Sequence, residues 1–307
     1  MYDTLSKFIF EDRAVRGELV HLEESYQTVL NSYHYPEPIA QLLGELMAAA
    51  SLLTATIKFK GEVSLQIQSE GIIKYAVINA THEQKLRGVA RWDESIKAFP
   101  SSFQELFNKG SLAITLAPKN KERYQGIVAL DKPSLAECLE DYFLQSEQLL
   151  TKVYLATENK ASNKAASNDD STLQARAAGM LLQIIPETSE TYQSGDNEDF
   201  THLSVLADTI TPEELLGLEK EVLIHRLFHE EDLRLFAPQA VAFECDCSST
   251  RSAQALRNVP KAELLDIVKE SGSVKMNCQF CHTEYAFDAI DIEHIHSDTT
   301  NMSQNKH

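Results

Sequence analysis

The 307-residue chain has no run of 18 apolar residues and no apolar leader segment at its start. The most apolar stretch, IAQLLGELMAAASLLTATI, contains Glu45 and the polar residues Gln41, Ser51 and Thr54, so we do not expect it to span a membrane. Charged residues recur through the first 20 positions, which excludes the pattern of a secretory signal peptide. We therefore expect a cytoplasmic protein without a membrane partner.

Positive charge is also scarce. Lysine and arginine total 28 against 46 aspartates and glutamates, and the net charge is −18. A chain this acidic repels phosphate backbones, and no run of lysine or arginine offsets the repulsion locally. Nucleic acid is therefore not an expected partner.

The familiar catalytic motifs are missing. The chain has no glycine-rich phosphate loop and no Gly-x-Ser-x-Gly elbow, and FHEED lacks the His-Glu-x-x-His spacing of zinc proteases. We predict no catalytic residue and no enzyme activity.

The patterns that are present predict an α+β fold. Apolar residues at spacings of three and four predict a helix over 37–58, and EVSLQIQ alternates as a half-buried strand does. Hairpin-like neighbours suggest a sheet built largely from antiparallel strands beside helices. We expect further strands at IIKYAVI, KLRGVARW, SLAITLAP, RYQGIVAL, TKVYLAT and AAGMLLQIIP, and a further helix over 133–146.

Changes in composition divide the chain into four parts. Residues 158–172 are small and polar and read as a loop, and an acidic polar stretch follows Pro186. Amphipathic helices over 199–230 come next, one of them with Thr211 as N-cap, Pro212 at the first turn and Glu214 three residues on. We expect an N-terminal α+β domain (1–186), a helical linker (187–234), a small C-terminal domain (235–296) and a disordered tail (297–307).

Four of the five cysteines lie in the C-terminal part, as Cys-x-Cys, 30 residues, then Cys-x-x-Cys. Thiols stay reduced in the cytosol, so clustered cysteines there indicate metal or redox chemistry. Structural zinc takes four thiolates at about 2.3 Å in a tetrahedron. We predict one Zn²⁺ per chain bound by Cys245, Cys247, Cys278 and Cys281. The spacing alone is typical of a static zinc module, and a redox switch at zinc or an unmetallated thiol pair are the alternatives.

Nearly the whole chain resembles the redox-regulated 33 kDa heat-shock chaperone (chaperonin) family of bacteria. The segments that carry the resemblance are RAVRGELV, SLLTATIKF, YAVIN, LRGVAR, ERYQGIV, CLEDYFLQSEQL, GMLLQ, RLFHEE and the two cysteine pairs. One position departs from the pattern, because His282 stands directly after Cys-x-x-Cys, where members often have glycine. If that turn needs a positive φ, histidine tolerates it less well than glycine does.

The resemblance implies an ATP-independent holdase that is inactive while reduced and zinc-bound. Oxidation would form the disulfides Cys245–Cys247 and Cys278–Cys281, release zinc and destabilise the C-terminal domain and the linker. The protein would then bind unfolding client proteins under oxidative and heat stress, and would form a homodimer. The linker helices would cover an apolar surface until that release.

Two rival functions follow from the same residues. A constitutive structural zinc module serving interactions would keep its zinc under peroxide. A thiol-disulfide oxidoreductase would need Cys-x-x-Cys at a helix N-terminus, whereas SVKMN and EYAF around this pair suggest a hairpin. Cys138 shares a helical face with Leu135, Leu139 and Tyr142, and we interpret it as a buried thiol that packs like a small apolar residue.

Overall fold

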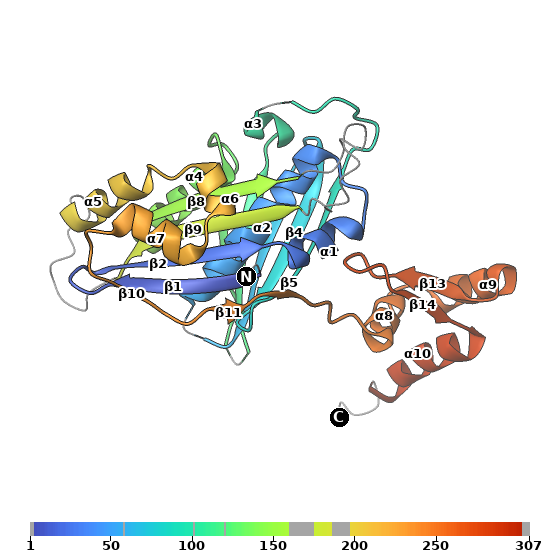
Figure 1. Cartoon of the computed structure of the whole chain (residues 1–307). Coiled ribbons are helices and arrows are strands. Elements are labelled where there is room, and N and C mark those ends of the chain that lie inside the picture. The colour runs from blue at the N-terminus through green and yellow to red at the C-terminus, as the bar shows by residue number, and fades with distance from the viewer. Residues whose placement is uncertain are drawn as a thin grey trace, which may run out of the picture. The chain divides into compact units, whose positions relative to one another are not determined.

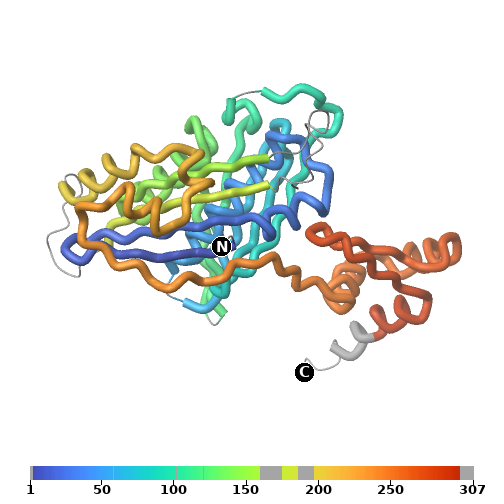
Figure 2. Tube along the Cα trace, in the orientation of Figure 1, coloured from blue at the N-terminus to red at the C-terminus, as the bar shows by residue number. Residues whose placement is uncertain are grey.

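A computed structural model describes residues 3–57, 59–100, 102–119, 121–159, 175–185 and 197–302. The chain divides into two compact units, Met1–Glu244 and Cys245–His307, and each is described by itself (Figures 1 and 2). Most of the loop predicted over 158–172, and the start of the linker predicted from 187, lie outside the described residues.

Helix α2 (Glu37–Thr56) is the centre of the N-terminal unit and packs between its two large sheets. It is apolar on almost every side because both of its faces are covered, and Leu43, Leu46 and Met47 are fully buried. In the part of the chain that the structure describes, α2 alone is long and apolar enough to cross a membrane, but 83% of its apolar window is buried in this unit. It is therefore a core helix.

The two sheets have six strands each. In sheet A the order is β10-β1-β2-β9-β8, with β11 also paired to β1, and in sheet B it is β12-β5-β4-β3-β6-β7. All pairs are antiparallel except β12 with β5, and the α+β class predicted from the sequence is confirmed. Sheet A comprises β1 (Thr4–Phe10), β2 (Val15–Leu22), β8 (Thr151–Glu158), β9 (Arg176–Ile184), β10 (Leu233–Leu235) and β11 (Gln239–Ala240). Sheet B comprises β3 (Gly61–Gln68), β4 (Ile73–Thr81), β5 (Lys85–Trp92), β6 (Ser111–Pro118), β7 (Tyr124–Ala129) and β12 (Ala242–Phe243).

Shorter helices complete the N-terminal unit. The helix predicted over 133–146 is an α-helix only to Tyr142 and then widens into a π-helical turn. These elements are α1 (Glu24–Asn31), α3 (Phe103–Leu106), α4 (Leu135–Tyr142) and the π-helix η1 (Phe143–Glu147).

Three consecutive helices cover the face of sheet A that points away from α2 (Figure 1). We call α5 (Glu198–Ala207), α6 (Pro212–Gly217) and α7 (Lys220–Phe228) the linker helices. The predicted start of α6 is confirmed, since the Thr211 side chain accepts from the Glu214 N–H and the Glu214 side chain accepts in return. The apolar faces of the linker helices bury Leu203, Leu215 and Leu223 in one core with Phe8 and Phe10 of β1.

Aromatic contacts and ion pairs add to this packing. The Phe228 ring of α7 lies edge-on to Phe10, with ring centroids 5.2 Å apart. Between β1 and β2, Arg13 pairs with Asp199 of α5 and with Glu231, its Nε lying 2.8 Å from Glu231 Oε2. The linker helices are therefore part of the N-terminal unit in this structure.

The C-terminal unit begins at Cys245 in the structure, later than the boundary at 235 predicted from the sequence. The difference arises because 233–243 form short strands on both sheets, with Phe8 opposite Leu235 and Leu86 opposite Phe243. Such short strands depend on distant partners and leave little local pattern in the sequence.

The C-terminal unit is small. Its core consists of six buried apolar residues, Leu256, Leu264, Val274, Phe287, Ile292 and Ile295. The last helix runs on to Met302, where the sequence analysis expects a disordered tail from 297. The elements are α8 (Ser249–Leu256), α9 (Lys261–Ser271), β13 (Val274–Asn277), β14 (Glu284–Phe287) and α10 (Ala289–Met302).

Candidate metal centre

The four cysteines predicted from their spacing come together in the C-terminal unit. Their sulfurs all lie within 4.8 Å of one another. The Sγ of Cys245 is 3.6 Å from that of Cys278, and the Sγ of Cys247 is 3.4 Å from that of Cys281. Thiolates at the vertices of a zinc tetrahedron would lie about 3.8 Å apart, so the spacing fits Zn²⁺. All four are free cysteines, which is the form that binds metal.

Each half of the cluster belongs to a different local structure. Cys245 and Cys247 lie between β12 and α8, whose first turn is capped by the Ser248 side chain accepting from the Arg251 N–H. Cys278 and Cys281 lie in the turn between β13 and β14, as the sequence analysis expects. This hairpin setting differs from the helix N-terminus that a thioredoxin-like oxidoreductase requires.

The turn after Cys-x-x-Cys is closed by two backbone hydrogen bonds. The Cys278 N–H donates to the Thr283 carbonyl at 3.0 Å, and the His282 N–H donates to the Cys278 carbonyl at 2.9 Å. His282 has φ of 58°, in the left-handed region that favours glycine. The positive φ considered in the sequence analysis is therefore present, and the exposed His282 side chain is not one of the clustered groups.

Two further side chains contact the sulfurs, and neither was predicted from the sequence. The Tyr285 hydroxyl donates to Cys247 Sγ at 3.2 Å, and the Thr283 hydroxyl lies 3.2 Å from Cys281 Sγ. Tyr285 lies in β14 and Thr283 directly precedes that strand, so their contacts with the sulfurs depend on how β13 and β14 pair. Hydrogen bonds of this kind orient metal ligands and favour the thiolate form.

The thiols differ in acidity because their surroundings differ. Burial raises the pKa of Cys245 to about 12 and raises the pKa of Cys278. Burial also opposes ionisation of Cys281, but hydrogen bonds, first of all with Thr283, lower its pKa to about 6. A bound cation favours ionisation of all the sulfurs that contact it.

Cys138, the fifth cysteine, belongs to the core and not to this centre. It is fully buried in α4 beside Leu139, and burial raises its thiol pKa. The interpretation of Cys138 as a small apolar packing residue is confirmed.

Comparison with known proteins agrees with the site. The model of the Hsp33 protein family matches residues 3–288. The chain belongs to the Hsp33 family. A 33 kDa chaperonin of Pseudoalteromonas atlantica is 54% identical over 301 residues, which cover 98% of this chain and 97% of that protein. A 33 kDa chaperonin of Shewanella sediminis is 50% identical over 297 residues, covering 97% and 96%.

The fold also agrees with a solved member of the Hsp33 family. The crystal structure of the 33 kDa chaperonin of Thermotoga maritima superposes with a TM-score of 0.76 at 22% identity, covering 98% of this chain and all of that one. Hsp33 proteins are redox-regulated chaperones and not enzymes, and the four-cysteine motif that belongs to this role is assembled here. The family and function predicted from the sequence are confirmed.

Proposed function

We propose that the reduced chain holds one Zn²⁺ on Cys245, Cys247, Cys278 and Cys281 and that oxidation of these residues activates client binding. The cluster of four sulfurs within 4.8 Å carries this proposal. The four thiolates would form a closed site for zinc. Bound zinc would supply most of the stability of a unit whose described core has six buried apolar residues.

The activating reaction is oxidation of four thiolates to two disulfides. Two molecules of peroxide accept four electrons and, with four protons, leave as four waters, and the oxidised sulfurs no longer bind metal. We assign the pairs Cys245–Cys247 and Cys278–Cys281. The two shortest sulfur distances join other pairs, Cys245 to Cys278 and Cys247 to Cys281, so peptide mapping of the oxidised protein is the test of this assignment.

Client binding would use the apolar surface that the linker helices cover. With the C-terminal unit unfolded, these helices lose the folded element that follows them in the chain, and their release uncovers an aromatic patch with Phe8 and Phe10. Exposed apolar patches of this kind bind other apolar surfaces. We further propose that the activated protein is cytoplasmic, acts without ATP, and forms a homodimer.

One experiment tests the activation. Zinc-loaded protein is treated with peroxide while a chromogenic chelator reports zinc and light scattering reports aggregation of a heat-denaturing client. Release of one zinc per chain together with suppressed scattering is the expected result. Zinc that stays bound under peroxide would indicate a constitutive structural module, and no gain in binding of an apolar dye would exclude exposure of an apolar surface.

A cysteine variant tests the ligand assignment. Cys278→Ser removes one of four thiolates and should abolish tight metal binding, because serine is a poor zinc ligand. Cys138→Ser is the matched control, since Cys138 lies in the N-terminal unit. Full zinc occupancy in Cys278→Ser would show that the assignment is wrong.

A further inference from the structure

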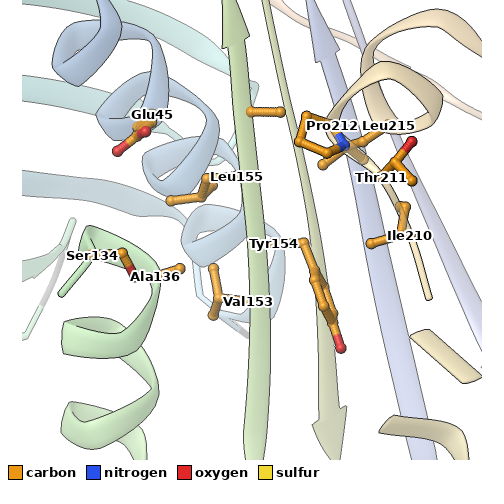
Figure 3. A pocket seen from close by; sticks show the side chains of 11 residues that line it. Glu45, Ser134, Ala136, Val153, Tyr154, Leu155, Ile210, Thr211, Pro212 and Leu215 are labelled. Carbon is orange, nitrogen blue, oxygen red and sulfur yellow. The ribbon is translucent and has the colours of Figure 1, made fainter. Parts of the chain in front are cut away.

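An open groove lies along the outer edge of β8, the last strand of sheet A (Figure 3). Its volume is about 250 Å³. Glu45 of α2 and Ala136 of α4 lie on one side of β8, and Pro212 and Leu215 of α6 lie on the other. The groove thus has one wall with a carboxyl group and one apolar wall.

The floor of the groove is a strand edge that has no partner strand among the described residues. Of the described strands of sheet A, only β9 pairs with β8. Because the Ile184 N–H donates to the Leu150 carbonyl, alternation along an antiparallel pair directs the backbone groups of odd-numbered β8 residues outward. The Val153 N–H confirms this direction by donating to Glu140 Oε1 at 2.9 Å. Two residues further on, the outward backbone groups of Leu155 face the groove and bond to no strand or side chain in the described part of the chain.

Glu45 has no partner of opposite charge in the part of the chain that the structure describes. Within the described residues it makes no hydrogen bond and no ion pair, although it is only partly accessible to solvent. Burial raises the pKa of its carboxyl group to about 7, and no neighbouring charge opposes that rise. A half-buried carboxylate without a counter-charge is unfavourable, and a cation placed beside it would remove the penalty.

We propose that the outer edge of β8 binds an extended segment of a client chain as an added strand, with a lysine or arginine of that segment on Glu45. Side chains of an added strand alternate between the two faces of the sheet, so a basic residue toward Glu45 implies apolar neighbours on the opposite face. Tyr154 and Ala156 of β8 lie on that face and remain there when α6 is released. The charge of Glu45 selects this occupant over an acidic or uniformly apolar one. The inference rests on the proposed client binding and gives it a surface and a sequence preference.

Binding of a labelled peptide tests the groove directly. The probe is a short fluorescein-labelled peptide of alternating lysine and valine, and its counterpart has glutamate in place of lysine. Oxidised full-length protein should bind the lysine peptide and not the glutamate peptide. Glu45→Gln should weaken binding of the lysine peptide about tenfold, the size of a lost charged hydrogen bond. Glu83→Gln, which removes an exposed carboxylate in sheet B's β4–β5 turn, should leave the affinity unchanged.

A second variant tests the backbone contact. Leu155→Pro removes an N–H that has no ladder partner, and proline is tolerated at such an edge position. Leu155→Pro should weaken binding of the lysine peptide as strongly as Glu45→Gln does. Thermal unfolding is measured to verify that the variant folds. The proposal fails if the oxidised protein binds neither peptide, if both variants bind like the wild type, or if Glu83→Gln loses as much affinity.

The outcomes separate this inference from the proposed function. Client aggregation is followed with the same oxidised samples. If peptide affinity is unchanged in both variants and aggregation is still suppressed, the proposed binding at the β8 edge is wrong and the proposed activation stands. Failure of the wild type to suppress aggregation overturns the activation, whether or not Glu45 affects the peptide. If Glu45→Gln alters sedimentation of the oxidised protein but not peptide affinity, the groove joins two copies of the chain and the proposal is wrong.

Discussion

At the scale of single residues, His282 shows how the metal centre tolerates a strained position. Its φ of 58° costs an ordinary side chain about 1 kcal/mol that glycine would not incur. We expect His282→Gly to raise the thermal stability of the zinc-loaded C-terminal unit by up to about 1 kcal/mol, and His282→Val to lower it, because β-branched residues suit this conformation least. Calorimetry of the zinc-loaded variants measures both changes. A lower stability for the glycine variant would show that the histidine side chain itself holds the turn.

Glu18 is a residue whose burial makes stability depend on pH. It is 2% exposed in β2, and burial raises its pKa from 4.5 to about 7 although Arg16 and Lys7 oppose the rise. Between these values the folded chain keeps a proton that the unfolded chain releases. Its contribution to stability is therefore present below pH 4.5 and is lost as the pH rises through 7, at up to about 1.4 kcal/mol per pH unit.

Glu18→Gln should remove the contribution of Glu18 to this slope and leave that of Glu45, whose pKa burial also raises to about 7. Urea denaturation of the reduced protein at pH 5, 6 and 7 measures it, because the midpoint and the slope with denaturant give the free energy of unfolding at each pH. Glu83→Gln, whose carboxylate is exposed, serves as the control and should keep the wild-type dependence. An unchanged dependence in Glu18→Gln would show that other groups determine it.

At the scale of elements, α5 offers a matched pair of positions. Leu203 is fully buried against sheet A, whereas Val205 on the same helix is 62% exposed. Leu203→Ala should cost about 2–5 kcal/mol of packing and should increase binding of an apolar dye by the reduced protein. Val205→Ala should change neither quantity by much. Equal dye binding by the two variants would show that packing of α5 does not hide the apolar surface.

Elements with a regular pattern could be predicted from the sequence. The spacing of leucines predicts α2, and the alternation of Val63, Leu65 and Ile67 predicts β3, in which all three are fully buried. Strands β1 and β2 were not predicted, because charged Lys7 and Glu18 interrupt their apolar pattern. These charges are tolerated through tertiary contacts, as where Lys7 Nζ donates to the Ala55 carbonyl at 2.7 Å.

Part of the metal centre could likewise be predicted from the sequence, and part could not. Cysteine spacing predicts the cluster because two close pairs suffice to form a tetrahedral site. The contacts of Tyr285 and Thr283 could not be predicted, since they depend on the register of β13 with β14, where Met276 lies opposite Tyr285. The groove along β8 depends likewise on the packing of α2, α4 and α6, which are far apart in the sequence.

At the scale of the whole molecule, the two units should respond differently to loss of metal. Zinc sites in small modules can supply about 10–16 kcal/mol of apparent folding energy, whereas the N-terminal unit has two large cores of its own. Removal of zinc by a chelator from the reduced protein should unfold the C-terminal unit and leave the sheets intact. Hydrogen exchange should then be fast in α8–α10 and remain slow in α2. Continued protection of α8–α10 without zinc would contradict the proposed role of the metal.

The short strands that precede Cys245 impose an order on any disruption that begins there. Bonds between the strands lie in series along the chain: Glu244 to Leu86, Val241 to Asp3, Phe236 to Lys7 and then Glu11 to Asp232. Because these bonds lie at successive positions along the chain, loss of structure that begins at Cys245 breaks them in this order. The last of these bonds, between Glu11 and Asp232, lies close to the end of α7. Unfolding that starts at the sulfurs therefore reaches the linker helices only after both sheets have lost their terminal strands.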